Sequence, residues 1–253
     1  MEVFQDYAYY YNAFYKDKDY KKEAEQIDFL LRKYGKNIKS LINFGCGTGK
    51  HDIELTKMGY SCNGIDMSDM MIDIARKNAN NLQPAIDFQV CDIRLYEAEK
   101  KYDAVVSLFH VMSYQNSNDD ILKAFKAARK ALNPGGIFLF DVWYGPGVLS
   151  DKPTLRVREA EDDTNKLIRI AKPIMHDKRN VVDVCYEVLV LNKGNGKVKT
   201  INEIHSMRYF FYPEMDLLLK KAGFELIDNL DCNSLEETDY TSWTSYFIAR
   251  AIE

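Results

Sequence analysis

Residues 41–51 read LINFGCGTGKH, and this stretch decides the fold because an apolar run breaks there into glycines at three alternate positions. The apolar residues predict a short buried strand, and the glycines predict a turn whose backbone can approach a ligand without a Cβ in the way. A helix that starts directly after such a turn offers free N–H groups to an anionic group. The stretch therefore predicts a small-molecule site between a strand and a helix.

Two well-known glycine loops do not fit this stretch. A loop for ATP phosphates needs G-x-x-x-x-G-K followed by Ser or Thr, whereas the residue five positions before Gly49 is not glycine and Lys50 is followed by His51. A dinucleotide loop needs G-x-G-x-x-G. Gly45 and Gly47 satisfy the first half of that pattern, but Lys50 stands where the third glycine belongs.

The third candidate fits better. N-F-G-C-G-T-G at 43–49 resembles D/E-x-G-x-G-x-G, the motif of class I methyltransferases that use S-adenosyl-L-methionine (SAM) and release S-adenosyl-L-homocysteine. Asn43 departs from the pattern, because the family usually has an acidic residue near the methionine amino group. A neutral amide still accepts a hydrogen bond from an ammonium group, but without the assistance of charge.

Downstream motifs strengthen the resemblance, which covers about residues 39–143. Asp66 ends the next strand, where a carboxylate can accept from both ribose hydroxyls, and Asp92 ends the third strand, where the family's acid or amide meets the adenine amino group. Residues 102–110 and 132–141 resemble the family's fourth and fifth strands. The resemblance implies these cofactor residues: Tyr11, Tyr20, Gly45, Cys46, Gly47, Asp66, Met67, Asp92, Ile93 and Leu108.

Apolar runs and helical patterns alternate along most of the chain, which predicts an α/β fold. Within the resemblance, this is a doubly wound, mostly parallel seven-stranded sheet in one domain over 1–253. Its expected parts are an N-terminal helical cap (1–35), a SAM-binding core (36–145), an inserted antiparallel β meander (154–208) that serves the substrate or a dimer surface, and the end of the core (209–253). Core strands are expected at 40–44, 61–66, 86–92, 102–110, 135–143, 225–231 and 245–252, and helices at 20–33, 50–58, 68–78, 118–132 and 213–224.

Composition excludes several classes of protein. The formal net charge of −4 lacks the basic footprint of a nucleic-acid-binding protein. The five cysteines are far apart and contain no C-x-x-C pair, so they predict reduced thiols and no metal site. No apolar run is long enough for a membrane span, and the first residues do not read as a signal peptide. We expect a cytoplasmic enzyme that binds neither nucleic acid nor membrane, with a homodimer plausible because the inserted sheet has exposed edges.

The N-terminal tyrosines resemble a narrower group, the sugar N- and O-methyltransferases of nucleotide-sugar and polysaccharide pathways. Those enzymes open with Tyr-Asp-x-x-Tyr and then Lys-Asp-Tyr, which residues 11–15 and 18–20 match in part. The resemblance implies that Tyr11 and Tyr20 close over SAM and that Tyr15 faces a small, sugar-containing acceptor, which a nucleotide sugar would satisfy. The same aromatics also suit the buried face of a helix, and both interpretations stay open.

Catalytic candidates follow from the chemistry of methyl transfer. A hydroxyl acceptor benefits from a general base, and His110 follows the fourth strand at the sheet edge where ligands bind in open α/β sheets. His205 lies in the inserted sheet, and strand alternation places it on one face with Glu203, with Arg208 on the other face. Surface positions remain an alternative for both histidines. The expected substrate residues are Tyr15, Tyr114, Trp143, Tyr144, Glu203 and Arg208.

Two further functions stay open at this point. The acceptor can instead be a protein or a lipid quinone, with the same fold. Alternatively, the chain is a non-catalytic SAM-binding scaffold, which the neutral Asn43 favours and the acidic pair Asp66 and Asp92 disfavours.

Overall fold

The computed structural model describes residues 8–252 of the chain. Its α-helices are α1 (Ala8–Phe14), α2 (Tyr20–Tyr34), α3 (Lys50–Lys57), α4 (Asp69–Asn78), α5 (Asn118–Ala131), α6 (Gly145–Ser150) and α7 (Tyr212–Lys221), with 3₁₀ turns η1 (Val111–Tyr114) and η2 (Asp177–Arg179). Its strands are β1 (Ser40–Phe44), β2 (Ser61–Asp66), β3 (Asp87–Val90), β4 (Tyr102–Ser107), β5 (Leu132–Tyr144), β6 (Arg156–Glu161), β7 (Asn165–His176), β8 (Val181–Asn192), β9 (Val198–Phe210), β10 (Phe224–Asp231) and β11 (Thr244–Ala251).

The core sheet has the predicted doubly wound form. Strand order runs β3-β2-β1-β4-β5, and β11 then joins β5 and β10 joins β11. The first five strands are parallel, whereas β11 is antiparallel to both of its neighbours. The strand order changes direction between β1 and β4, since the chain adds strands outward to one side from β1 and to the other side from β4. The carboxyl ends of β1 and β4 therefore lie side by side, and ligands of open α/β sheets bind at such a point. The predicted fold class is confirmed.

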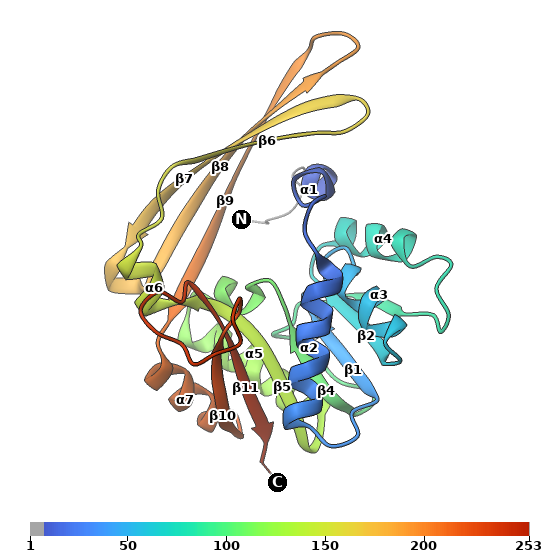
Figure 1. Cartoon of the computed structure of the whole chain (residues 1–253), viewed down its shortest axis with the longest axis vertical. Helices are drawn as coiled ribbons and strands as arrows, with labels where there is room; N and C mark the ends of the chain where they lie inside the picture. The colour runs from blue at the N-terminus through green and yellow to red at the C-terminus, as the bar shows by residue number, and fades with distance from the viewer. Residues whose placement is uncertain (1–7, 253) are drawn as a thin grey trace.

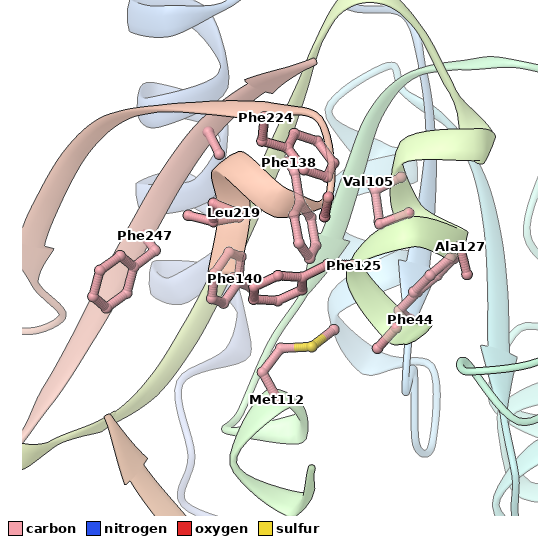
Figure 2. Close-up of a cluster of buried hydrophobic side chains, with 14 of the residues drawn as sticks. Phe44, Val105, Met112, Phe125, Ala127, Phe138, Phe140, Leu219, Phe224 and Phe247 are labelled. Carbon is pink, nitrogen blue, oxygen red and sulfur yellow. The ribbon is translucent and has the colours of Figure 1, made fainter. Parts of the chain in front are cut away.

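Two apolar layers hold this sheet between helices. Figure 2 shows one layer, in which Phe138 and Phe140 of β5 face Phe125 of α5. The ring centroids of Phe138 and Phe140 are 4.5 Å apart, those of Phe125 and Phe140 are 5.2 Å apart, and all three side chains are fully buried. Burying one such side chain contributes about 1.5–3 kcal/mol. Helix α2 covers the opposite layer with Ile27, Leu30 and Leu31.

The predicted antiparallel meander forms strands β6 to β9 and rises from the core (Figure 1). It is joined to the core sheet because β9 runs parallel to the end of β5, with Trp143 opposite Tyr209 and Tyr144 opposite Phe210. Phe14 of α1 is buried against Val188 on this sheet. The N-terminal cap therefore has two parts: α2 packs on the core, and α1 packs on the meander.

The fourth strand is shorter than predicted. It ends at Ser107 instead of at residue 110, because Phe109 and His110 both take φ of +67°, which no strand residue adopts. Tyr144 also differs from its predicted role, since it is 8% exposed and packs in the hydrophobic core instead of facing an acceptor. The aromatic residues Tyr7, Tyr11, Phe14 and Tyr15 stand at a helical spacing, which predicts a first helix, and Tyr7 lies outside the described residues.

Candidate active site

The glycine loop joins β1 to α3, and its three glycines present backbone without side chains. Gly45, Gly47 and Gly49 have φ of +76°, +53° and +72°, a region that L side chains rarely adopt. A Cβ at Gly45 would lie 2.5 Å from Val111, whereas a Cβ at Gly47 would meet no protein atom within 4 Å. The loop therefore needs glycine both for its conformation and for the space that it leaves open.

A cavity of about 520 Å³ lies beside this loop. Its size suits a small ligand. Asp66 lines it from the end of β2 and accepts hydrogen bonds from the backbone N–H groups of Gly47 and Ser68, each at 2.9 Å. Burial raises the pKa of Asp66, and these two bonds oppose the rise. Five residues predicted to bind the cofactor line this cavity: Gly45, Asp66, Met67, Asp92 and Ile93.

Asp92 has a partner that the sequence did not suggest. Arg94 binds its carboxylate through Nε and Nη2, with the shortest contact at 2.6 Å, and also reaches Asp120 at 3.1 Å. Burial would raise the pKa of Asp92, but the bonds and charge of Arg94 outweigh burial and hold it below its usual value. Arg94 thus shares the carboxylate that was predicted to meet adenine.

The remaining cofactor candidates surround the loop from other sides. Leu108 lines a second cavity of about 330 Å³. Cys46 belongs to the loop itself, is 6% exposed, and donates its backbone N–H to Ile65 of β2. The Tyr20 ring centroid lies 4.9 Å from that of His51, and the Tyr11 and Tyr15 rings are tilted at 37° with centroids 4.5 Å apart.

Side chains of opposite charge meet at the second cavity. Glu23 of α2 binds His51 Nε2 at 2.6 Å and also pairs with Lys18. Burial would raise the pKa of Glu23, yet the His51 bond and the Lys18 charge lower it to about 2. The Lys18 ammonium lies 4.0 Å from the centroid of Phe109, which lines the same cavity.

A third cavity, of about 230 Å³, lies between the meander and the carboxyl edge of the core sheet. Most of its wall is aromatic, and Tyr114 lines both this cavity and the one at the glycine loop. We refer to it below as the aromatic pocket. Its aromatic and imidazole side chains are Tyr15, Phe109, His110, Tyr114, Trp143, Tyr186, His205 and Trp243.

Tyr114, His205 and Glu203 form a hydrogen-bonded series at the aromatic pocket. Tyr114 Oη lies 2.8 Å from His205 Nδ1, and His205 Nε2 lies 3.1 Å from Glu203 Oε2. A carboxylate accepts only, so Nε2 carries the imidazole proton and Nδ1 accepts from the Tyr114 hydroxyl. His205 is 2% and Glu203 9% exposed, which places both behind the pocket wall instead of in solvent.

His110 is held in a strained conformation beside the same pocket. Its backbone N–H donates to both carboxylate oxygens of Asp141, at 3.0 and 3.1 Å, and its ring Nδ1 lies 2.5 Å from Asp141 Oδ2. Left-handed conformations at residues other than glycine cost about 1–3 kcal/mol and cluster at functional sites. Asp141, near the end of β5, therefore fixes the backbone of His110 and lies beside its ring, whose Nδ1 makes no hydrogen bond among the described residues.

Arg208 lies away from the aromatic pocket. As strand alternation predicted, it shares a face of β9 with Ser206 and Ile204, opposite to His205. Arg208 pairs there with Glu214 and donates to Asn118 Oδ1 at 2.7 Å. These bonds tie β9 to α5 and α7, so the structure gives Arg208 a stabilising role and not the predicted contact with a substrate.

Sequence reasoning missed several residues of the pocket wall. Tyr186 comes from β8, directly opposite Glu203, so strand pairing of the predicted meander was the signal that would have found it. Trp243 precedes β11, and its ring centroid lies 4.8 Å from that of Trp143. Nothing local in the sequence marks Trp243, because the contact joins segments 100 positions apart.

Two further observations concern the described part of the chain. Within residues 8–252, no cluster of His, Cys, Asp or Glu side chains has the geometry to hold a metal ion. Over the same range, no helix is both long enough and apolar enough to cross a membrane.

Comparison with known proteins agrees with the geometry. Residues 42–136, from β1 into the start of β5, match the family described as "Methyltransferase domain". A dTDP-3-amino-3,4,6-trideoxy-alpha-D-glucopyranose N,N-dimethyltransferase of Streptomyces venezuelae is 26% identical over 223 residues, which are 87% of this chain and 91% of that protein. A dTDP-4-amino-2,3,4,6-tetradeoxy-D-glucose N,N-dimethyltransferase of Saccharopolyspora spinosa is 27% identical over 221 residues, covering 86% and 85% of the two chains.

The fold is also that of a solved structure. The sugar N-methyltransferase KedS8 of Streptoalloteichus superposes with a TM-score of 0.82 at 20% identity, over 100% of this chain and 97% of the other. The similarity therefore extends beyond the glycine loop to the N-terminal helices and the meander.

Proposed function

We propose that this chain, which is a class I SAM-dependent methyltransferase, transfers methyl groups to the amine nitrogen of a nucleotide-linked amino sugar. One observation carries the choice of acceptor: the aromatic pocket adjoins the cavity at the glycine loop, and Tyr114 lines both. The relatives named as dTDP-amino-sugar N,N-dimethyltransferases support the same class of acceptor.

The residues at the glycine loop fit SAM. When bound, SAM supplies a methyl group on a positively charged sulfur that leaves readily. Gly47 leaves open space for the methionine end, and the first turn of α3 offers N–H groups to its carboxylate. Asp66 keeps lone pairs for the ribose hydroxyls, because each of its oxygens accepts one protein hydrogen bond.

The aromatic pocket suits a sugar ring with a charged tail. Flat rings offer apolar surface to the C–H faces of a sugar, while a few polar groups orient it. Arg158 of β6 pairs in register with Arg169 of β7 on the face that carries Tyr186. The Arg158 guanidinium lies 5.6 Å from the Tyr15 ring centroid. Guanidinium groups match the geometry of phosphate oxygens, so this face suits the diphosphate of a nucleotide sugar.

The series Tyr114–His205–Glu203 suits the removal of a proton from an amine. An amine attacks only in its neutral form, and transfer of one methyl group leaves a protonated product that must lose a proton before a second transfer. In this proposal Tyr114 Oη contacts the amine and takes its proton while the hydroxyl proton of Tyr114 passes to His205 Nδ1, and Glu203 stabilises the imidazolium. His110, fixed by Asp141, completes the wall beside the attacking atom.

The test is incubation of the purified chain with SAM and a panel of dTDP-amino sugars, with mass spectrometry of the products. We expect a gain of one or two methyl groups on a dTDP-amino sugar. dTDP-glucose, which offers only hydroxyls, should remain unmodified, and the free amino sugar should react far more slowly. Methylation of dTDP-glucose alone would contradict the choice of nitrogen, and equal rates with the free amino sugar would contradict the role given to the arginines.

A further inference from the structure

Asn43 and Asp52 form a buried pair beneath the glycine loop. Asn43 is on β1 just before the loop, and Asp52 is in the first turn of α3 just after it. The Asn43 amide donates from Nδ2 to Asp52 Oδ2 at 2.9 Å. The two residues are 1% and 0% exposed, and the remaining side-chain oxygen of each has no hydrogen-bond partner among the described residues.

A proton on the Asp52 carboxyl group would give these two buried oxygens a donor. A carboxylate is an acceptor only, so an ionised Asp52 leaves two buried oxygens without a donor, and each such oxygen costs about 1–3 kcal/mol. A protonated Asp52 becomes a donor at one oxygen and an acceptor at the other, which complements the amide group of Asn43. Burial raises the pKa of Asp52 to about 7 against the opposing bonds from Asn43 and from the backbone N–H of Asp52 itself, and the charge of Asp66 adds to the rise.

The surroundings of Asp52 lack a cation that pairs with it. Lys18 and His51 are already paired with Glu23, and no described cation lies within ion-pair distance of Asp52. The titratable and charged groups around it are Cys46 of the loop, Cys62 and Asp66 of β2, Lys50 and His51 of α3, and Lys18 and Glu23 next to them from the N-terminal segment.

We propose that Asn43 and Asp52 hold one proton in the cofactor-free protein and release it when SAM binds on the glycine loop, so that Asp52 supplies from the helix the negative charge that Asn43 lacks. The O–H bond of the carboxyl breaks and the proton passes to solvent. SAM carries an ammonium, a sulfonium and a carboxylate group, so it brings a net positive charge, and in a buried site this net charge favours the ionised form of Asp52. By linkage, the carboxylate strengthens SAM binding by the same factor.

This inference rests on the SAM part of the proposed function and not on the acceptor. Asp52 is a positioning residue here, since it acts through the loop and lines none of the cavities described above. The test is therefore the binding of SAM alone, without acceptor. Isothermal titration is run between pH 6 and 8.5 in buffers of different ionisation enthalpy, and the dependence of the heat on the buffer gives the number of protons released.

The deciding quantity is the difference between the wild type and Asp52→Asn, because the α-amino group of the ligand itself titrates near pH 7.7–8.0. The asparagine keeps the shape of the protonated aspartic acid, but its amide group does not titrate and cannot release a proton. We expect the wild type to release a substantial fraction of a proton more than the variant near pH 7. Above that pH, the wild type should bind SAM about tenfold more tightly, which is within the usual range of coupling between two sites.

Glu54→Gln is the matched control, since Glu54 lies on the same helix and pairs with Lys57 at the surface. It should release as many protons as the wild type. If Asp52→Asn does not fold, the infrared carbonyl band of a protonated carboxylic acid in the wild type should disappear on addition of SAM. Three outcomes would overturn the proposal. These are equal proton release by the wild type and Asp52→Asn, an infrared band that SAM leaves unchanged, and the absence of SAM binding. Normal proton release without methylation of any amino sugar would instead refute only the acceptor.

Discussion

The two sides of the site are built in different ways. On the cofactor side, the glycine loop holds its shape through backbone conformation, and its residues lie within a few positions of one another. On the side proposed for the acceptor, the aromatic pocket takes side chains from the N-terminal segment, from the turn after β4, from β5, β8 and β9, and from the start of β11 and the residue before it. The cofactor side therefore depends on which residues permit the backbone turn, and the acceptor side depends on which strands meet.

The largest effect is expected at Gly45. Gly45→Ala places a Cβ 2.5 Å from Val111 in a backbone with φ of +76°. Strain at such a residue costs about 1–3 kcal/mol, and displacement of Val111 adds to it. We expect a clear fall in melting temperature together with loss of binding of S-adenosylhomocysteine, measured by calorimetry.

Gly47→Ala distinguishes a loss of ligand binding that comes from an unstable fold from one that comes from a side chain placed beside the ligand. Its Cβ meets no protein atom, so only the backbone penalty at φ of +53° applies to stability. The variant should be more stable than Gly45→Ala and still bind the ligand poorly, because the Cβ enters the cleft. Normal binding by Gly47→Ala would show that the ligand does not lie on this loop.

The second effect tests the acceptor side alone. Tyr114→Phe removes the hydroxyl that joins the pocket to His205, and general acid–base catalysis is typically worth 10²–10⁴-fold in rate. We expect kcat to fall by about 10²-fold while the affinity for SAM stays within a few-fold of the wild type. His205→Gln should act similarly, because it removes the imidazole nitrogen that accepts from Tyr114.

His176→Gln is the control for these variants. This histidine pairs with Asp183 at the C-terminal end of β7 and itself lines none of the three cavities, so it should be replaceable without change in kcat. A loss in Tyr114→Phe that appears equally in SAM affinity would contradict the separation between the two sides of the site.

The sequence predicted the cofactor side better than the acceptor side, because local spacing determines the first and contacts between distant segments determine the second. Gly45, Gly47, Asp66 and Asp92 stand at fixed spacings along strands and turns, so local patterns place them. The alternation of β9 also paired Glu203 with His205 correctly. Contacts between distant segments were beyond local patterns.

Two residues show where local reasoning ends. Tyr144 continues the apolar pattern of β5 into the core, so its ring does not reach the site that its position at the strand end suggested. Arg94 follows Asp92 by two positions and folds back on it, an interaction that a strand-end pattern does not contain. In both cases packing near the strand end determines where the side chain lies, and sequence spacing does not predict that packing.

A smaller effect is expected at Arg158 on the inner face of the meander. Arg158→Ala should raise KM for a nucleotide sugar about tenfold with little change in kcat, because it removes a phosphate contact and no reacting group. The loss should shrink as ionic strength rises, since salt screens exposed charges. Lys172→Ala on the other face of β7 is the control and should leave KM unchanged. Equal effects of both substitutions would mean that overall charge, and not a contact on this face, guides the substrate.

The last prediction concerns the stability of the cofactor side and its dependence on pH. The pKa of Asp52 is raised to about 7 in the folded chain by burial, above its ordinary value of 3.8, so the folded state binds the proton more tightly than the unfolded state. The stabilising contribution of the protonated form is complete below about pH 4 and is lost as the pH rises towards 7. Asp52→Asn does not titrate, so its melting temperature relative to the wild type should increase from pH 5 to pH 8 and then level off. Each pH unit between the two pKa values changes the gap by up to about 1.4 kcal/mol, and each 1 kcal/mol corresponds to about 2–4 °C for a chain of this size. A gap that stays constant between pH 5 and pH 8 would mean that Asp52 is already ionised, and the buried oxygens of Asn43 and Asp52 would then need another donor.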